Sequence, residues 1–186
     1  EVTVHGEVLL MKNPQEAISK KVGLVPEDRK KHGLILGMKI RENETLSILD
    51  RLARLGFVNR AEERETAKKY FDRLRVRAPG MESITGGLSG GNQQKVVIAK
   101  WVAADCDVLM VDEPTRGVDI GAKTEIHDIL REIAEAGKAV LMVSSELPEL
   151  LKMATRILVF RNGEIVGELT HEEADEEKLI RLMTGV

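Results

Sequence analysis

A serine and two glycines precede one predicted helix of this chain, and their polar groups could bind a phosphate. Residues 88–95 read LSGGNQQK. Ser89 offers a hydroxyl, while Gly90 and Gly91 leave backbone N–H groups open at a helix N-terminus, where the helix dipole also favours an anion. For Ser-Gly-Gly alone, a serine N-cap beside a flexible loop is the simpler explanation, since serine is a favoured N-cap. The complete string of eight residues is more specific than these three residues.

Two adjacent carboxylates follow a short apolar run. Residues 108–114 read VLMVDEP, which places Asp112 and Glu113 directly after a predicted strand. Because α/β sheets bind ligands at the carboxyl ends of their strands, Asp112 could hold Mg²⁺ through water and Glu113 could be the base for an attacking water. An acidic pair in this position is more often a solvated strand end. Its place downstream of the serine–glycine string favours the catalytic interpretation.

The first two stretches of the chain differ in their predicted elements. Residues 1 to about 40 combine short strands, Val22–Val25 among them, with a helix that starts at Asn13 and Pro14. Residues from about 41 to 104 are predicted to be helical. Leucines at positions 46, 49, 52 and 55 recur near the helical period and stop at Gly56. The last helix of this stretch is expected to run from about Gly90 to Ala104.

From about residue 105 onward, strands and helices alternate. The strand before Asp112 is followed by an amphipathic helix that ends at Gly137, and then by Ala139–Val143, which is apolar throughout. We expect this strand to be buried on both faces. Asn162-Gly163 predicts the turn of a hairpin, and a final helix begins near Asp175. Strand–helix–strand order predicts parallel pairing with right-handed crossovers, so the fold class is α/β with a helical insertion.

Composition excludes several classes of protein. The net charge of −3 gives no electrostatic support for a nucleic-acid partner. The longest apolar run, Ala139–Val143, is far shorter than the roughly 20 residues of a membrane-spanning helix. The histidines lie far apart and have no cysteine neighbours, which leaves no zinc-site spacing. Cys106 is the only cysteine, so we expect a reducing compartment and an inert thiol.

Several strings resemble one family of proteins. Residues 88–95 resemble the signature motif of ABC-type ATPases, and residues 108–114 look like a Walker B strand with its catalytic glutamate. Three further strings resemble the second nucleotide-binding half of the tandem ATPase subunit of bacterial monosaccharide importers, the ribose/galactose/xylose group. They are GLVPEDRK at residues 23–30, DEPTRGVD at 112–119 and SSELPE at 144–149. The resemblance covers nearly the whole chain. It implies a truncated P-loop NTPase core (about 1–40 and 105–186) with a helical signature subdomain (about 41–104).

The resemblance also assigns roles to individual residues. Glu27 takes the Q-loop position, Asp119 is the D-loop aspartate, and Ser145 holds the switch position usually occupied by histidine. The implied catalytic residues are Glu113, Ser145 and Glu27. The implied nucleotide-binding residues are Ser89, Gly90, Gly91, Gln94 and Asp119, and the implied metal-binding residues are Asp112 and Glu27. Serine is a poorer donor to a γ-phosphate than an imidazole, so we expect slow turnover at this half's own site.

The sequence contains no G-x-x-x-x-G-K-[ST] loop. That loop supplies the backbone cradle and the lysine for the β- and γ-phosphates. In the family it lies upstream of the strand with which this chain begins, and we expect a truncation there. We therefore expect the isolated chain to be inactive.

The implied function is ATP hydrolysis, with Mg²⁺, that energises import of a monosaccharide at the cytoplasmic face of the cell membrane. The implied partners are a second nucleotide-binding half, integral-membrane permease subunits and, indirectly, a periplasmic or extracellular sugar-binding protein. Two alternatives remain open. One is a soluble ABC-type ATPase of translation or DNA repair, which should show long basic or coiled-coil insertions that this sequence lacks. The other is a non-catalytic partner that contributes only its signature face.

Overall fold

The computed structural model describes residues 3–4, 6–8 and 13–185. The chain forms two compact units, Glu1–Leu141 and Met142–Val186, which we describe one at a time. The boundaries that the sequence predicts near residues 40 and 104 stay a prediction.

A parallel sheet lies at the centre of the first unit. Its strand order is β3-β6-β7, and its strands are β3 (Val22–Val25), β6 (Val108–Asp112) and β7 (Ala139–Val143). β3 and β6 run parallel, with Val25 opposite Val111. For this pair of strands the predicted parallel pairing is confirmed.

The apolar strand β7 is less buried than its sequence predicts. Leu141 is 53% exposed, and burial alternates between half-buried and exposed along the strand. β7 is an edge strand of this sheet, so the prediction of burial on both faces is wrong. An apolar run shows that a strand can be buried, but not whether a second layer covers it.

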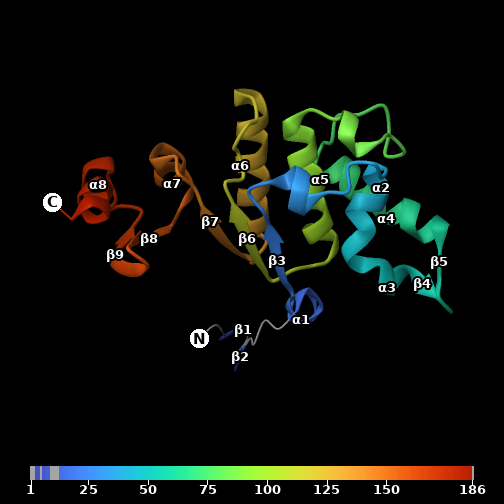
Figure 1. Ribbon diagram of the computed structural model, residues 1–186, viewed down its shortest axis with the longest axis horizontal. Helices are drawn as coiled ribbons and strands as arrows, with labels where there is room; N and C mark the ends of the chain where they lie inside the picture. The colour runs from blue at the N-terminus through green and yellow to red at the C-terminus, as the bar shows by residue number, and fades with distance from the viewer. Residues whose placement is uncertain (1–2, 5, 9–12, 186) are drawn as a thin grey trace. The chain divides into compact units, whose positions relative to one another are not determined.

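Two long helices pack around this sheet. α5 (Gly90–Ala103) contacts β3 and lies between the sheet and the helices α2 (Ile40–Thr45) and α4 (Arg60–Arg73), as Figure 1 shows. α6 (Ile120–Glu135) packs against α5 through a buried apolar stripe. The predicted end of α6 is confirmed, because Gly137 has a φ of +84°.

The predicted leucine helix is interrupted. A 3₁₀ turn (Leu46–Ile48) leads into a short α3 (Leu49–Leu52), and then β4 (Ala53–Arg54) and β5 (Phe57–Val58) form a hairpin. Its turn residues, Leu55 and Gly56, have φ values of +51° and +82°. Successive left-handed residues match the twist of a two-residue hairpin, so Leu55 is fully exposed instead of continuing the apolar face of a helix.

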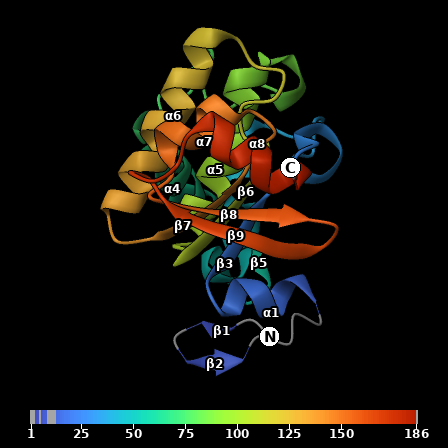
Figure 2. The same ribbon diagram turned by 90° about the vertical axis from the view of Figure 1, so that its left-hand side faces the viewer.

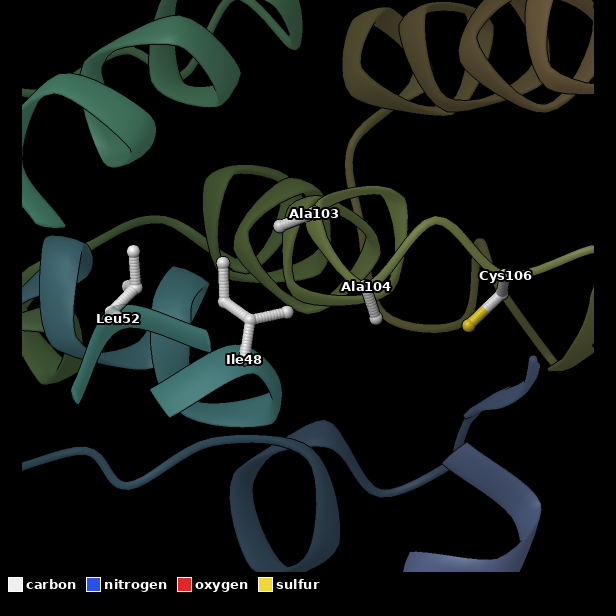
Figure 3. Packing of buried hydrophobic residues seen from close by; sticks show 5 residues of the cluster. All are labelled: Ile48, Leu52, Ala103, Ala104 and Cys106. Atoms are coloured by element: carbon white, nitrogen blue, oxygen red, sulfur yellow. The ribbon is translucent and has the colours of Figure 1, made fainter. Parts of the chain in front are cut away.

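A small apolar cluster joins the end of α5 to α3. Its buried members are Ile48, Leu52, Ala103, Ala104 and Cys106 (Figure 3). Burial raises the pKa of the Cys106 thiol to about 11, which agrees with the expected inert thiol. The half-buried Trp101 packs against the same cluster.

The remaining elements of the first unit are short. They are β1 (Thr3–Val4), β2 (Glu7–Val8), α1 (Pro14–Ser19), a π-helical turn (Arg29–Gly33) and a 3₁₀ turn (Thr85–Gly87). Asn13 caps α1 as predicted, because its side chain accepts the Glu16 N–H at 2.8 Å. The predicted strand residues Val2, Leu9 and Leu10 lie outside the described residues.

The second unit is a hairpin with two helices. Its elements are α7 (Leu147–Met153), β8 (Arg156–Arg161), β9 (Glu164–Thr170) and α8 (Glu176–Thr184). β8 and β9 run antiparallel with α8 beside them (Figure 2). Asn162 and Gly163 have φ values of +51° and +83°, so the predicted hairpin turn is confirmed.

Across the part of the chain that the structure describes, no helix combines the length and the apolar character needed to cross a bilayer.

Candidate functional site

The serine–glycine string lies at the start of α5. Ser89 is exposed at the N-cap position, but its side chain makes no capping hydrogen bond to the first turn. Its Oγ instead accepts from Asn92 Nδ2 at 2.9 Å. Ser89 thus occupies the N-cap position, as the simpler interpretation expects, but its side chain does not bond the N–H groups of this turn.

The two glycines of this turn are required by close packing. A Cβ on Gly90 would lie 2.6 Å from Arg29 Nη2 and 3.0 Å from the carbonyl oxygen of Gly117. A Cβ on Gly91 would overlap Ala122 of α6. Only glycine therefore fits at these two positions. The absence of side chains lets Arg29 and Gly117 pack closely against Gly90, and Ala122 against Gly91, at the start of α5.

Gln94, which the resemblance assigns to nucleotide binding, points into the protein. It is 1% exposed, and its buried Nε2 has no hydrogen-bond partner among the described residues. The side chain cannot reach a ligand at the start of α5 without a change in packing. Nucleotide contact by Gln94 stays a prediction.

The acidic pair lies at the carboxyl end of β6, as predicted. Asp112 ends the strand and Glu113 follows it, both half-buried. Glu113 has a φ of +46°, in the left-handed region that non-glycine residues rarely adopt and that is often found at functional sites. Its carbonyl accepts the Arg116 N–H at 3.1 Å, so the chain turns back immediately after the acidic pair.

Glu27 does not stand alone at the end of β3. Its carboxylate forms an ion pair with Arg116 of the loop that follows β6. The two residues line an open cleft of about 270 Å³, whose other lining residues are Asp28, Arg29 and Lys30. Sequence reasoning did not find Arg116 or Arg29 as partners, although both occur in the strings that resemble the importer family.

Arg29, which lines the cleft, also bonds the loop that follows β6. Its Nη1 donates to the Arg116 carbonyl at 3.0 Å and its Nη2 to the Gly117 carbonyl at 3.4 Å. Burial lowers the pKa of Arg29, and the Asp28 carboxylate partly offsets this.

Asp119 begins α6. Its carboxylate accepts the Ala122 N–H at 2.9 Å, so it serves as the N-cap while the residue remains exposed. Ala122 is also the residue next to Gly91. The structure therefore brings Asp119 and the signature helix together within the first unit.

Ser145 belongs to the second unit and is exposed between β7 and α7. Its neighbour Ser144 donates to Glu149 Oε2 at 2.5 Å and accepts the Glu146 N–H at 3.1 Å, which organises the turn before α7. The switch role of Ser145 stays a prediction.

One of the two predicted metal ligands fits a nucleotide-bound Mg²⁺. The described residues contain no cluster of three or more acidic, histidine or cysteine side chains that could hold a metal alone. Mg²⁺ usually keeps several waters and uses one or two carboxylates beside the phosphates of its substrate. Asp112 meets this requirement, whereas Glu27 would first have to leave Arg116.

Known proteins resemble this chain in sequence. The family model described as ABC transporter matches residues 1–116. A ribose import ATP-binding protein of Rubrobacter xylanophilus is 49% identical over 186 residues, which cover all of this chain and 36% of that protein. A ribose/galactose/methyl galactoside import ATP-binding protein of Burkholderia ambifaria is 46% identical over 185 residues, or 99% of this chain and 36% of that protein. The chain thus spans 36% of the length of these relatives.

Solved structures show the same fold. The dimeric structure of a bacterial ABC transporter cassette superposes with a TM-score of 0.70 at 25% identity, over 84% of this chain and 66% of that chain. A post-hydrolysis cassette dimer bound to ADP and phosphate gives a TM-score of 0.71 at 24% identity, over the same 84% and 66%. The predicted fold class is confirmed.

Proposed function

This chain belongs to the ABC transporter family, and we propose that it is one nucleotide-binding half of the ATP-hydrolysing subunit of a monosaccharide importer. The observation that carries this proposal is the start of α5, where Ser89 is exposed at the N-cap position and its side chain does not bond the N–H groups of the first turn. The sugar-import relatives, 46–49% identical over nearly the whole chain, support it.

Under this proposal, Ser89, Gly90 and Gly91 act on a nucleotide that another half holds. The backbone N–H groups, the helix dipole and the Ser89 hydroxyl stabilise negative charge that develops on the γ-phosphoryl group. The dimeric form of the related cassette supports a site built from two halves. Asp119, at the start of the neighbouring α6, would lie at the same junction.

In the first unit, the half's own site would contain Asp112, Glu113 and Glu27, and the resemblance assigns the switch position to Ser145 of the second unit. Asp112 would hold Mg²⁺, which when bound with ATP neutralises charge on the phosphates. Glu113 accepts the proton of the attacking water. Glu27 is engaged by Arg116, and Ser145 lacks an imidazole, so this site turns over slowly and the partner half performs most of the hydrolysis.

The complete assembly we propose includes a second nucleotide-binding half and membrane permease subunits at the cytoplasmic face of the cell membrane. A sugar-binding protein on the other side would deliver the monosaccharide. Because the sequence has no G-x-x-x-x-G-K-[ST] loop, these 186 residues by themselves neither bind ATP tightly nor hydrolyse it.

The substitution Ser89→Arg tests the proposed action in trans. In the complete subunit we expect ATP hydrolysis to fall by about 100-fold or more, the scale of losing a preorganised transition-state donor. Labelling by a photoreactive ATP analogue should persist at this half's own site. Ser19→Arg, a change of another exposed serine on α1, is the control and should keep full activity. Loss of labelling at this half alone would refute the assignment.

A further inference from the structure

A short turn after β3 contacts helix α5 at both of its ends. The turn is the π-helix Arg29–Gly33, which Asp28 caps by accepting the N–H groups of Lys30 and Lys31, each at 3.1 Å. At its far end, the Gly33 carbonyl accepts Lys100 Nζ of α5 at 2.8 Å. A Cβ on Gly33 would lie 3.0 Å from Val97 Cγ2 of the same helix. The turn therefore packs directly along α5.

At its near end, the turn presents Arg29 to the first residues of α5. The Arg29 Nη2 atom occupies the space that a side chain at position 90 would need. From there the guanidinium donates to two successive carbonyls, those of Arg116 and Gly117. A planar guanidinium can make both bonds from one rigid group, whereas an ammonium is a single point donor.

The loop that Arg29 contacts joins Glu113 to Asp119. Glu27 holds the same loop through its ion pair with Arg116. The Arg29 Nε atom is buried without a hydrogen-bond partner among the described residues, so the guanidinium is desolvated without full compensation. The hydrogen bonds to the loop and the charge of the neighbouring Asp28 carboxylate offset this cost.

We propose that Arg29 is a positioning residue that holds the loop between Glu113 and Asp119 in register with the start of α5. The general base and the phosphate-binding turn then keep a fixed relative position, although they act on nucleotides in different sites. This inference rests on the proposed function and deepens it, because it names the side chain that links the two parts of the machinery.

The first experiment measures kcat and KM for ATP in the complete subunit. Arg29→Lys keeps the charge and loses the two-carbonyl contact, Arg29→Gln loses both, and Lys31→Gln removes an exposed charge from the same turn. We expect both Arg29 variants to displace the start of α5, which serves the nucleotide of the other half, and so to lower kcat between about tenfold and 100-fold, the scale of a misplacement of about 1 Å. Their KM should stay within about twofold, and Lys31→Gln should behave as the unchanged protein. Full activity of Arg29→Lys, or an equal loss in Lys31→Gln, would overturn the proposal.

The second experiment needs no ATPase activity. A double-mutant cycle combines Gly90→Ala with Arg29→Ser and measures the free energy of unfolding. The added methyl group displaces the guanidinium only when Arg29 is present, so Gly90→Ala should destabilise less in the Arg29→Ser background. Gly91→Ala meets Ala122 instead, and its cost should be equal in both backgrounds. Additive effects for Gly90 and Arg29 would refute the positioning role. If the complete subunit had no ATPase activity, the proposed function would be contradicted. The double-mutant cycle would still test whether Arg29 packs against Gly90, because it measures unfolding alone.

Discussion

At the scale of single residues, Glu44 is the most unusual group outside the site. It is fully buried on α2, and neither carboxylate oxygen has a hydrogen-bond partner among the described residues. Desolvation, together with the charge of Asp72 on α4, raises the pKa of Glu44 from its usual 4.5 to about 8. The carboxyl group is therefore protonated in the folded protein at neutral pH.

This protonation makes stability depend on pH. Below about pH 4.5 Glu44 is protonated in both the folded and the unfolded state. As the pH rises toward about 8, only the unfolded state releases the proton, so folding loses up to about 1.4 kcal/mol per pH unit. We expect Glu44→Gln to remove this slope, which urea unfolding at several pH values between 5 and 8.5 measures. Glu65→Gln, an exposed position on α4, should leave the slope unchanged. An unaltered slope in Glu44→Gln would mean that Glu44 is charged in the folded state.

Sequence reasoning identified chemistry-bearing residues better than their partners. Ser89, Asp112 and Glu113 could be found because each has a fixed place relative to one helix or strand. The contacts of Arg29 and Arg116 could not be predicted, because these long side chains bond groups in segments that are distant in the sequence. The same limit applies to Glu44, whose burial results from packing between helices.

At the scale of elements, the β4–β5 hairpin has an unfavourable residue in its turn. Leu55 adopts a φ of +51° while its side chain is fully exposed. A two-residue turn of this kind prefers asparagine followed by glycine. We expect Leu55→Asn to stabilise the protein by about 0.5–1 kcal/mol, measured as a rise in the midpoint of urea unfolding. Leu55→Val, which is β-branched and exposed at the same position, should lower it. A loss of stability in Leu55→Asn would show that the leucine side chain makes a stabilising contact.

The hairpin also shows why the leucine period misled the helix prediction. Positions 46, 49, 52 and 55 recur every three residues, close to the helical period of 3.6, and Gly56 is a plausible end for such a helix. The chain needs only one residue in the left-handed region before Gly56 to turn into a hairpin instead. The pattern Asn162-Gly163 was predicted correctly because its first residue tolerates that region.

Lys95 joins two elements that carry site residues. It is 1% exposed on α5, and its Nζ donates to the Arg75 carbonyl at 2.9 Å and to Glu125 Oε2 of α6 at 2.5 Å. Lys95→Met should keep the packing, remove the side-chain donor to the Arg75 carbonyl and leave Glu125 paired, among the described residues, only with Arg77, at a cost of about 2 kcal/mol. Thermal or urea unfolding measures this cost. Lys68→Met, which removes an exposed ion pair on α4, should change stability by about 0.5 kcal/mol or less. Equal effects for the two lysines would contradict a structural role for Lys95.

At the scale of the whole molecule, the alternation of strands and helices predicted the parallel sheet. It did so because crossover connections force parallel pairing. Exposure along β7 was not predictable, because burial depends on layers that the strand's own residues do not specify. The junction of Arg29, Gly90 and Gly117 likewise arises only when three separate segments meet.

In the proposed subunit, we expect the two halves to hydrolyse ATP at unequal rates. This half retains Asp112 and Glu113, but Glu27 is engaged by Arg116 and the switch position holds Ser145. We therefore expect Glu113→Gln to lower the steady-state ATPase rate of the complete subunit by about twofold or less, because the group that would orient the base is already absent. The matching change in the other half should remove nearly all activity, and single-turnover hydrolysis in each variant would separate the two sites. A loss on the order of 10³ from Glu113→Gln alone, the scale of losing an essential catalytic group, would make Glu113 the principal base and end the asymmetric interpretation.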